Sequence, residues 1–222
     1  VCGSGLIGES PAFQRCLREL RLAAASDANV LFLGETGTGK GLFAEALHKI
    51  SRRGKLPFVI VDGGILKESL CESELFGHRK GAFTGADGDR KGWFETVEAG
   101  TLFLDEIGNA PLSIQAKLLQ VVERRVFQHL GENQDITFHG RLVCATSSPL
   151  DERVEDGSFR RDLFSRINQF RIDLPPLRER RLDIPILARH FVREHAAGRN
   201  LELSQSVLDI IESYDFPGNV RE

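Results

Sequence analysis

The residues best suited to chemistry fall into two short groups, one rich in glycine and one acidic. The glycine-rich run, Gly34-Glu35-Thr36-Gly37-Thr38-Gly39-Lys40, has the spacing of a phosphate-binding loop. Its glycines let consecutive backbone N–H groups turn towards phosphate oxygens, and Lys40 adds a cation for the terminal phosphates. A glycine-rich turn beside a surface lysine is the alternative. The apolar strand predicted before the run and the helix predicted after it favour a nucleotide site.

The acidic group, Asp105-Glu106, directly follows the apolar residues 102–104. A strand that ends in two carboxylates places them at the carboxyl edge of a parallel sheet, beside a phosphate-binding loop. Asp105 would hold Mg²⁺, directly or through water, and Glu106 would orient and deprotonate the water that attacks in phosphoryl transfer. A solvated strand end is the alternative, but both groups in order in one chain predict a site for ATP or ADP with Mg²⁺.

The elements that must position these groups alternate along the chain. Helical periodicity over 11–25 and 42–50 separates short, continuously apolar runs at 30–33, 58–61, 101–104 and 142–145. Such runs are typical of a parallel sheet covered by helices on both faces, so we expect an α/β fold. After the turn at 174–177 only helical patterns follow, at 184–197 and 207–213. We therefore expect an α/β nucleotide-binding subdomain over 1–173 and a small helical lid subdomain over 174–222.

Composition narrows the class of protein. The 222 residues are 41% apolar and 27% charged, as in folded chains, and no stretch is apolar enough to span a membrane. The start lacks a signal-peptide profile, so a cytoplasmic location is expected, and the absence of Met suggests a piece of a longer protein. The net charge of −3 argues against a broad nucleic-acid surface, which leaves DNA binding to a domain outside this chain.

The four cysteines are expected to be reduced thiols. Cys2, Cys16, Cys71 and Cys144 form no CxxC pair and have no nearby histidine at metal-ligand spacing. Cys144 lies in an apolar run, so we expect it to be buried.

Further motifs resemble one family. The run Gly81-Ala82-Phe83-Thr84-Gly85-Ala86 matches the GAFTGA loop of the AAA+ central domain of sigma-54-dependent activators, also called bacterial enhancer-binding proteins. The runs 72–78, 159–166, 174–180 and 217–222 are similar to the same family. The resemblance extends from about Leu6 to Glu222. It implies a P-loop AAA+ ATPase that remodels the closed promoter complex of sigma-54 RNA polymerase.

The resemblance also implies roles for single residues. The GAFTGA loop would touch sigma-54 and move as nucleotide is hydrolysed. Phe83 lies among glycines and charged residues, so we expect it to face solvent; a ring folded into the core is the alternative. Arg160 and Arg166 match arginine fingers that reach a neighbouring subunit's γ-phosphate, which requires a ring, by resemblance a hexamer; surface salt bridges are the alternative. Arg221 matches the second sensor, which contacts nucleotide within its own chain.

Three positions depart from the family pattern, and all three are expected on the γ-phosphate side of the site. Gly41 follows Lys40 where P-loops carry Ser or Thr and this family carries Glu, so it offers Mg²⁺ no side chain. Asp62 replaces an Asn that hydrogen-bonds the catalytic glutamate; an ionised Asp cannot donate that bond and would repel Glu106. Ser147, after Thr146, replaces the Asn of the first sensor with a shorter hydroxyl. ATP or ADP is therefore expected to bind through the backbone loop and Lys40, and hydrolysis is expected to be slow or absent.

Two classes of function remain open, and a third is disfavoured. The first is a mechanochemical ATPase that activates transcription. The second is a regulatory module that senses nucleotide through assembly without turning it over. A P-loop kinase or ligase shares only the first two motifs, so the GAFTGA match and the two arginines disfavour it.

Overall fold

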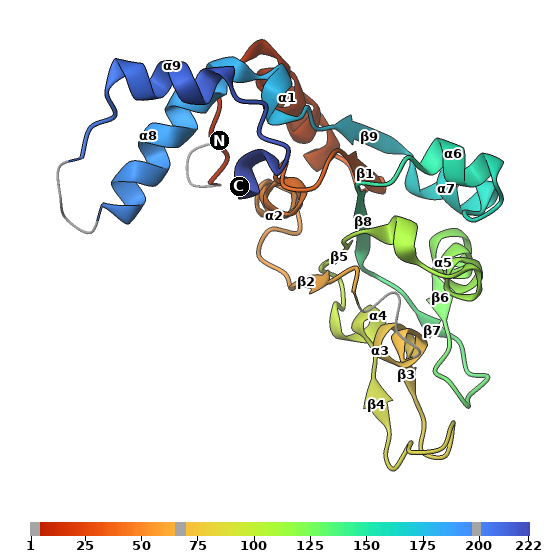
Figure 1. The fold of residues 1–222 in the computed structure, drawn as a ribbon. Helices are drawn as coiled ribbons and strands as arrows, with labels where there is room; N and C mark the ends of the chain where they lie inside the picture. The colour runs from red at the N-terminus through yellow and green to blue at the C-terminus, as the bar shows by residue number, and fades with distance from the viewer. Residues whose placement is uncertain (1–4, 65–69, 197–200) are drawn as a thin grey trace.

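A five-stranded parallel sheet forms the centre of the molecule (Figure 1). The structure is a computed structural model that describes residues 5–64, 70–196 and 201–222. The strand order is β2-β5-β8-β1-β9, so the predicted α/β fold with a parallel sheet is confirmed. The strands are β1 (Val30–Leu33), β2 (Phe58–Val61), β5 (Thr101–Leu104), β8 (Arg141–Thr146) and β9 (Phe170–Asp173).

Successive residues along the three central strands, β5, β8 and β1, point into two different cores. On one face, Phe32 of β1, Phe103 of β5 and Val143 of β8 pack against the two helices α1 (Pro11–Ala24) and α2 (Lys40–Ile50).

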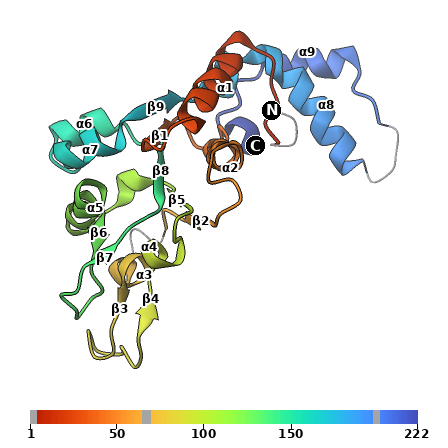
Figure 2. The same cartoon turned by 180° about the vertical axis from the view of Figure 1, so that it is seen from behind.

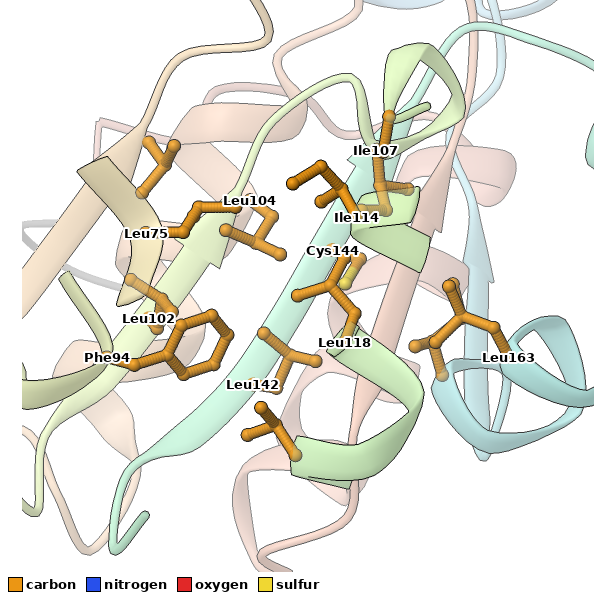
Figure 3. Close-up of a cluster of buried hydrophobic side chains, with 14 of the residues drawn as sticks. Leu75, Phe94, Leu102, Leu104, Ile107, Ile114, Leu118, Leu142, Cys144 and Leu163 are labelled. Carbon is orange, nitrogen blue, oxygen red and sulfur yellow. The ribbon is translucent and has the colours of Figure 1, made fainter. Parts of the chain in front are cut away.

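On the other face, Leu102, Leu104, Leu142 and Cys144 lie under a second helical layer (Figure 3). Phe94 adds an aromatic ring to this core and stacks on Phe76 at 5.2 Å between ring centroids. The helices of this side are α3 (Cys71–Phe76), α4 (Trp93–Thr96), α5 (Leu112–Arg124), α6 (Leu150–Glu155) and α7 (Arg161–Ile167).

Two short antiparallel pairs extend from this body. One pairs β3 (Gly77–His78) with β4 (Arg90–Lys91), and the other pairs β6 (Val126–Phe127) with β7 (Ile136–Thr137). A 3-10 turn, η2 (Ile107–Asn109), follows β5. The β3–β4 hairpin lies at the end of the molecule opposite α8 and α9 in both views (Figures 1 and 2).

The last part of the described chain is helical. Its elements are η3 (Leu177–Glu179), η4 (Arg181–Asp183), α8 (Ile184–His195), α9 (Gln205–Ser213) and η5 (Asn219–Arg221). Leu177, Ile184 and Leu187 form a small third core. Buried Asp183 accepts hydrogen bonds from the backbone N–H of Ser10 (2.8 Å) and from its hydroxyl (2.7 Å), which ties this part to the start of α1.

Several elements differ from the sequence predictions. The helix predicted at 42–50 begins two residues earlier, at Lys40, because Gly39 takes a left-handed conformation and ends the loop there. The strand at β9 and the helices α3 to α7 were not predicted. Of the helix predicted over 184–197, residue 197 lies outside the described residues.

Burial agrees with the cysteine predictions where the structure describes them. Cys16 and Cys144 are buried free thiols, and burial raises the pKa of Cys16 to about 11 and that of Cys144 well above its usual range. Cys2 lies outside the described residues. Across the described ranges, no helix combines the length and apolar character needed to cross a bilayer.

Candidate nucleotide-binding site

A cavity of about 790 Å³ opens at the carboxyl edge of the sheet. The phosphate-loop residues 36–37 and 39–41 line it, together with strand-end residues 62–64, 105–106 and 147–148, and Arg221 from η5. The two motif groups recognised in the sequence therefore meet, because the ends of β1, β2, β5 and β8 lie at one edge of a parallel sheet. Gly41, Asp62 and Ser147, the three departures from the family pattern, all line this cavity.

The backbone of the phosphate loop depends on glycine at two positions. Gly37 and Gly39 have φ values of +83° and +103°, in the left-handed region that L side chains rarely adopt. A Cβ atom at Gly37 would also overlap the carbonyl oxygen of Gly218. The loop conformation therefore excludes larger residues at Gly37 both by strain and by contact.

Lys40 lies between this loop and the acidic residues. Its side chain is 6% exposed, and its Nζ donates to the carbonyl oxygens of Gly34 (2.8 Å) and Glu35 (3.2 Å). The same Nζ lies 3.4 Å from Oε1 of Glu106. A cation is thus held at the cavity wall, next to the carboxylate that we expect to act on water.

Glu106 is held in a strained backbone conformation by its neighbours. Its φ of +49° and ψ of +47° are left-handed, a conformation that costs energy for a residue with a side chain. Its Oε2 accepts hydrogen bonds from the backbone N–H of Ser147 (2.9 Å), the hydroxyl of Ser147 (3.0 Å) and the hydroxyl of Thr146 (3.2 Å). The serine hydroxyl therefore reaches Glu106 despite being shorter than the family's Asn.

Asp62 was expected to repel Glu106 without a hydrogen bond between them, and among the described residues no hydrogen bond joins the two side chains. Within the described residues, the partners of the Glu106 carboxylate are Lys40, Thr146 and Ser147, whereas Asp62 Oδ1 accepts from the backbone N–H of Gly64 at 2.7 Å. The negative charge of Asp62 acts on Asp105. Burial, then the Glu106 charge and, to a smaller extent, the Asp62 charge raise the pKa of Asp105 above its usual value.

This arrangement fits a divalent cation bound together with nucleotide. Three carboxylates, those of Asp62, Asp105 and Glu106, line one cavity, so added positive charge would relieve their repulsion. In the part of the chain that the structure describes, no group of three or more His, Cys, Asp or Glu side chains could hold a metal ion. Phosphate oxygens and water would have to complete the coordination shell of a Mg²⁺ ion held by Asp105.

The three arginines that the sequence analysis singled out, Arg160, Arg166 and Arg221, lie in two different parts of the molecule. Arg221 lines the cavity of its own chain. Arg160 and Arg166 belong to α7 and its N-terminal end, on the far side of the sheet from α8 (Figure 1), and neither is among the described residues that line the cavity. They form surface ion pairs, Arg160 with Asp162 at 2.7 Å and Arg166 with Glu123 at 3.0 Å.

The GAFTGA run forms the tip of the β3–β4 hairpin. Gly81 and Gly85 have positive φ values, and the backbone N–H of Gly81 donates to the carbonyl of Ala86 at 2.9 Å. Phe83 does not project freely into solvent, which corrects the sequence expectation. It is half-buried and packs edge-on against His78, at 5.0 Å between ring centroids, because His78 offers an aromatic surface at the hairpin base.

Residues 6–173 match the family described as the Sigma-54 interaction domain, and residues 178–222 match the AAA+ ATPase lid domain. The chain belongs to the sigma-54 interaction domain family. The AAA+ fold and the helical lid expected from the sequence are thereby confirmed.

This sigma-54 interaction domain is also similar to regulatory proteins of known name. It is 50% identical to the Nif-specific regulatory protein of Bradyrhizobium diazoefficiens, covering 98% of this chain and 38% of the relative. It is 49% identical to the transcriptional regulatory protein ZraR of Salmonella typhimurium, covering 98% and 50%. The chain thus spans half or less of these relatives.

NtrX from Brucella abortus has the same fold in two structures. One, in complex with ADP, has a TM-score of 0.88 at 28% identity and covers 98% of this chain and 49% of NtrX. The other, in complex with ATP, has a TM-score of 0.88 at 29% identity and covers 98% and 50%.

Sequence reasoning missed one set of residues beside the cavity. Arg178, Arg180 and Asn219 contact the phosphate loop from the lid. All three stand within runs that resemble the family, at 174–180 and 217–222. Their spacing gave no sign of what they contact, because each partner lies more than 140 residues away along the chain.

Proposed function

We propose that this chain is the ATP-binding and ATP-hydrolysing motor domain of a sigma-54-dependent transcription activator. The observation that carries the proposal is the convergence of Lys40, Asp105, Glu106 and Arg221 on one cavity of nucleotide size. The ADP and ATP complexes of NtrX support it.

The side chains divide the chemistry between them. The loop N–H groups and Lys40 would bind the phosphates, and Arg221 would contact the nucleotide from the lid. A bound Mg²⁺ would neutralise charge that develops on the phosphate oxygens, and Asp105 would hold it. Glu106, oriented by Thr146 and Ser147, would accept a proton from the attacking water.

The site of one chain would be completed by another. Arg160 and Arg166 are exposed on a surface away from their own cavity, so they can only act on the nucleotide of a neighbour. A head-to-tail ring, as in a hexamer, gives every cavity such a neighbour. Each finger would exchange its surface ion pair for the γ-phosphate charge.

The GAFTGA loop, residues 81–86, would transmit the movement that accompanies ATP hydrolysis to sigma-54. It lies at the far end of the molecule from the lid (Figure 2). Phe83 is packed on His78. Release of that ring would expose an aromatic surface for the partner, and movement of the hairpin would remodel the closed promoter complex.

A second function, nucleotide sensing without turnover, is favoured by two residues. Gly41 offers no side-chain oxygen to a cation, and Asp62 adds negative charge beside Asp105. Steady-state phosphate release separates the two functions, because only the motor releases phosphate repeatedly.

The proposed function is tested by following ATP-dependent remodelling of a closed complex of sigma-54 polymerase on promoter DNA. Phe83→Ala is expected to keep phosphate release and lose remodelling, because its change is remote from the cavity. Lys40→Ala is expected to lose both. Remodelling by Phe83→Ala at the wild-type rate would refute the role of the loop.

A further inference from the structure

The lid contacts four successive residues of the phosphate loop. Glu35 is contacted through its carboxylate, and the loop residues Thr36, Gly37 and Thr38 through their backbone carbonyl oxygens. All the lid partners come from 178–180 and 219–220. We call these contacts the lid clamp.

Asn219 is the centre of the lid clamp. Its side-chain Nδ2 donates to Oε2 of Glu35 (3.1 Å) and to the carbonyl oxygen of Thr36 (3.0 Å). Its Oδ1 accepts from the backbone N–H of Leu177 (2.7 Å), so one amide joins the loop to both segments of the lid. The residue is 1% exposed and has a φ of +56°, a conformation in which Asn is among the better tolerated residues.

The other lid clamp contacts lie on both sides of Asn219. Arg178 holds the Glu35 carboxylate with both terminal nitrogens, at 2.8 and 2.5 Å. The backbone N–H of Val220 donates to the carbonyl oxygen of Gly37 at 3.1 Å. Buried Arg180 donates to the carbonyl oxygen of Thr38 at 3.3 Å.

We propose that Asn219 is a positioning residue of the nucleotide site, and that the lid clamp sets the conformation of the phosphate loop. The proposal rests on the proposed nucleotide binding. Trans peptide geometry points the N–H groups of Gly37 and Gly39, two residues that line the cavity, away from the carbonyl oxygens of Thr36 and Thr38 that the lid holds. The N–H of Thr38 instead donates to the carbonyl oxygen of Glu35 at 3.3 Å, within the loop. The loop is thereby ordered before nucleotide arrives, so less conformational entropy is lost on binding.

Coupling of this kind acts in both directions. If the lid clamp strengthens nucleotide binding, bound nucleotide strengthens the lid clamp by the same factor. Val220 and Arg221, the neighbours of Asn219, line the cavity, so nucleotide would meet the same short segment that holds the loop.

The test is nucleotide affinity of the purified chain, measured by calorimetry with ADP and with Mg-ATP. Asn219→Asp keeps size and the acceptor for Leu177, but it turns a carboxylate oxygen towards Glu35 and the carbonyl of Thr36. We expect affinity to fall about tenfold or more, because a hydrogen bond to a charged group becomes a repulsion. Asn133→Asp, the same change at an exposed position, is the control and should bind as the wild type does.

Two further variants separate positioning from loss of fold. Adding Glu35→Gln to Asn219→Asp removes the repulsion between the two carboxylates and is expected to restore part of the affinity, which a general folding defect would not allow. Arg178→Ala changes a partly exposed side chain and should also weaken nucleotide binding. If Asn219→Asp does not fold, the nucleotide affinity of Arg178→Ala tests the proposal instead. Wild-type affinity in a folded Asn219→Asp, or in Arg178→Ala where only that variant folds, overturns the proposal. A wild-type chain that binds no nucleotide would instead refute the proposed function.

Discussion

Ser147 helps to orient the carboxylate of Glu106. Its hydroxyl and its backbone N–H both reach Oε2 of Glu106, and Thr146 adds a third donor to the same oxygen. Oε1 remains for Lys40 at 3.4 Å. The carboxylate is thus held by one oxygen and paired through the other, an arrangement that fixes its direction towards the cavity.

Removal of one donor should slow turnover without weakening nucleotide binding. In Ser147→Ala the backbone donor remains and the hydroxyl is lost, which costs about 1 kcal/mol and lowers kcat about fivefold. Phosphate release gives kcat, and calorimetry gives the affinity for ADP. Ser213→Ala, on an exposed lid position, is the matched control. An unchanged kcat would mean that Ser147 does not orient Glu106.

Asp62 should act through charge rather than through a hydrogen bond to Glu106. Asp62→Asn removes one of three carboxylates from the cavity and lowers the pKa of Asp105 towards its usual value, so Asp105 holds a cation better. We expect turnover to rise severalfold and the Mg²⁺ concentration for half-maximal activity to fall. Turnover equal to or below that of the wild type would count against this explanation.

At the scale of elements, the β3–β4 hairpin is held by side chains because its strands are only two residues long. Arg79 joins Glu132 (2.8 Å), from the segment between β6 and β7, to Asp89 (3.1 Å) of its own hairpin. Buried His129 lies between Glu132 (3.3 Å) and Glu95 (2.9 Å). The stem of the GAFTGA loop is therefore anchored to the segment between β6 and β7, which His129 in turn ties to α4.

Loss of this anchor should weaken binding to sigma-54 and leave ATP hydrolysis unchanged. We expect Arg79→Ala to weaken binding to sigma-54 severalfold, measured with an ATP transition-state analogue, while phosphate release stays at the wild-type rate. Arg18→Ala, an exposed arginine on α1, is the control. If Arg79→Ala lowers phosphate release as much as sigma-54 binding, the hairpin stem is not an independent element.

The lid clamp predicts a pH dependence of stability. Hydrogen bonds from Arg178, then from Asn219, lower the pKa of Glu35 to about 2 from an ordinary value of 4.5. A lowered folded-state pKa stabilises the fold above pH 4.5, and this stabilisation is lost as pH falls towards 2. The difference in Tm between wild type and Glu35→Gln should therefore be constant from neutral pH to about 5 and shrink below 4.5. A difference that already shrinks between pH 7 and 6 would contradict this assignment.

At the scale of the whole molecule, the sequence predicted most strands of the sheet and the place of the nucleotide site, but it missed most of the contacts between side chains. Four of the five sheet strands were visible as apolar runs. β9 was not, because on this edge strand the charged residues Arg171 and Asp173 alternate with the apolar ones. The lid clamp was hidden because Glu35 and Asn219 lie 184 residues apart. The packing of Phe83 on His78 was missed because the residues between them suggested an exposed loop.

The central claim is that the site is shared between chains of a ring. Its most direct test is phosphate release per chain from Mg-ATP, measured over a wide range of protein concentration for the wild type and for Arg160→Ala. Because Arg160 lies outside its own cavity, turnover per chain should rise steeply with concentration in the wild type and be lost in the variant at every concentration. Turnover per chain that is independent of concentration and equal in both proteins would contradict the claim.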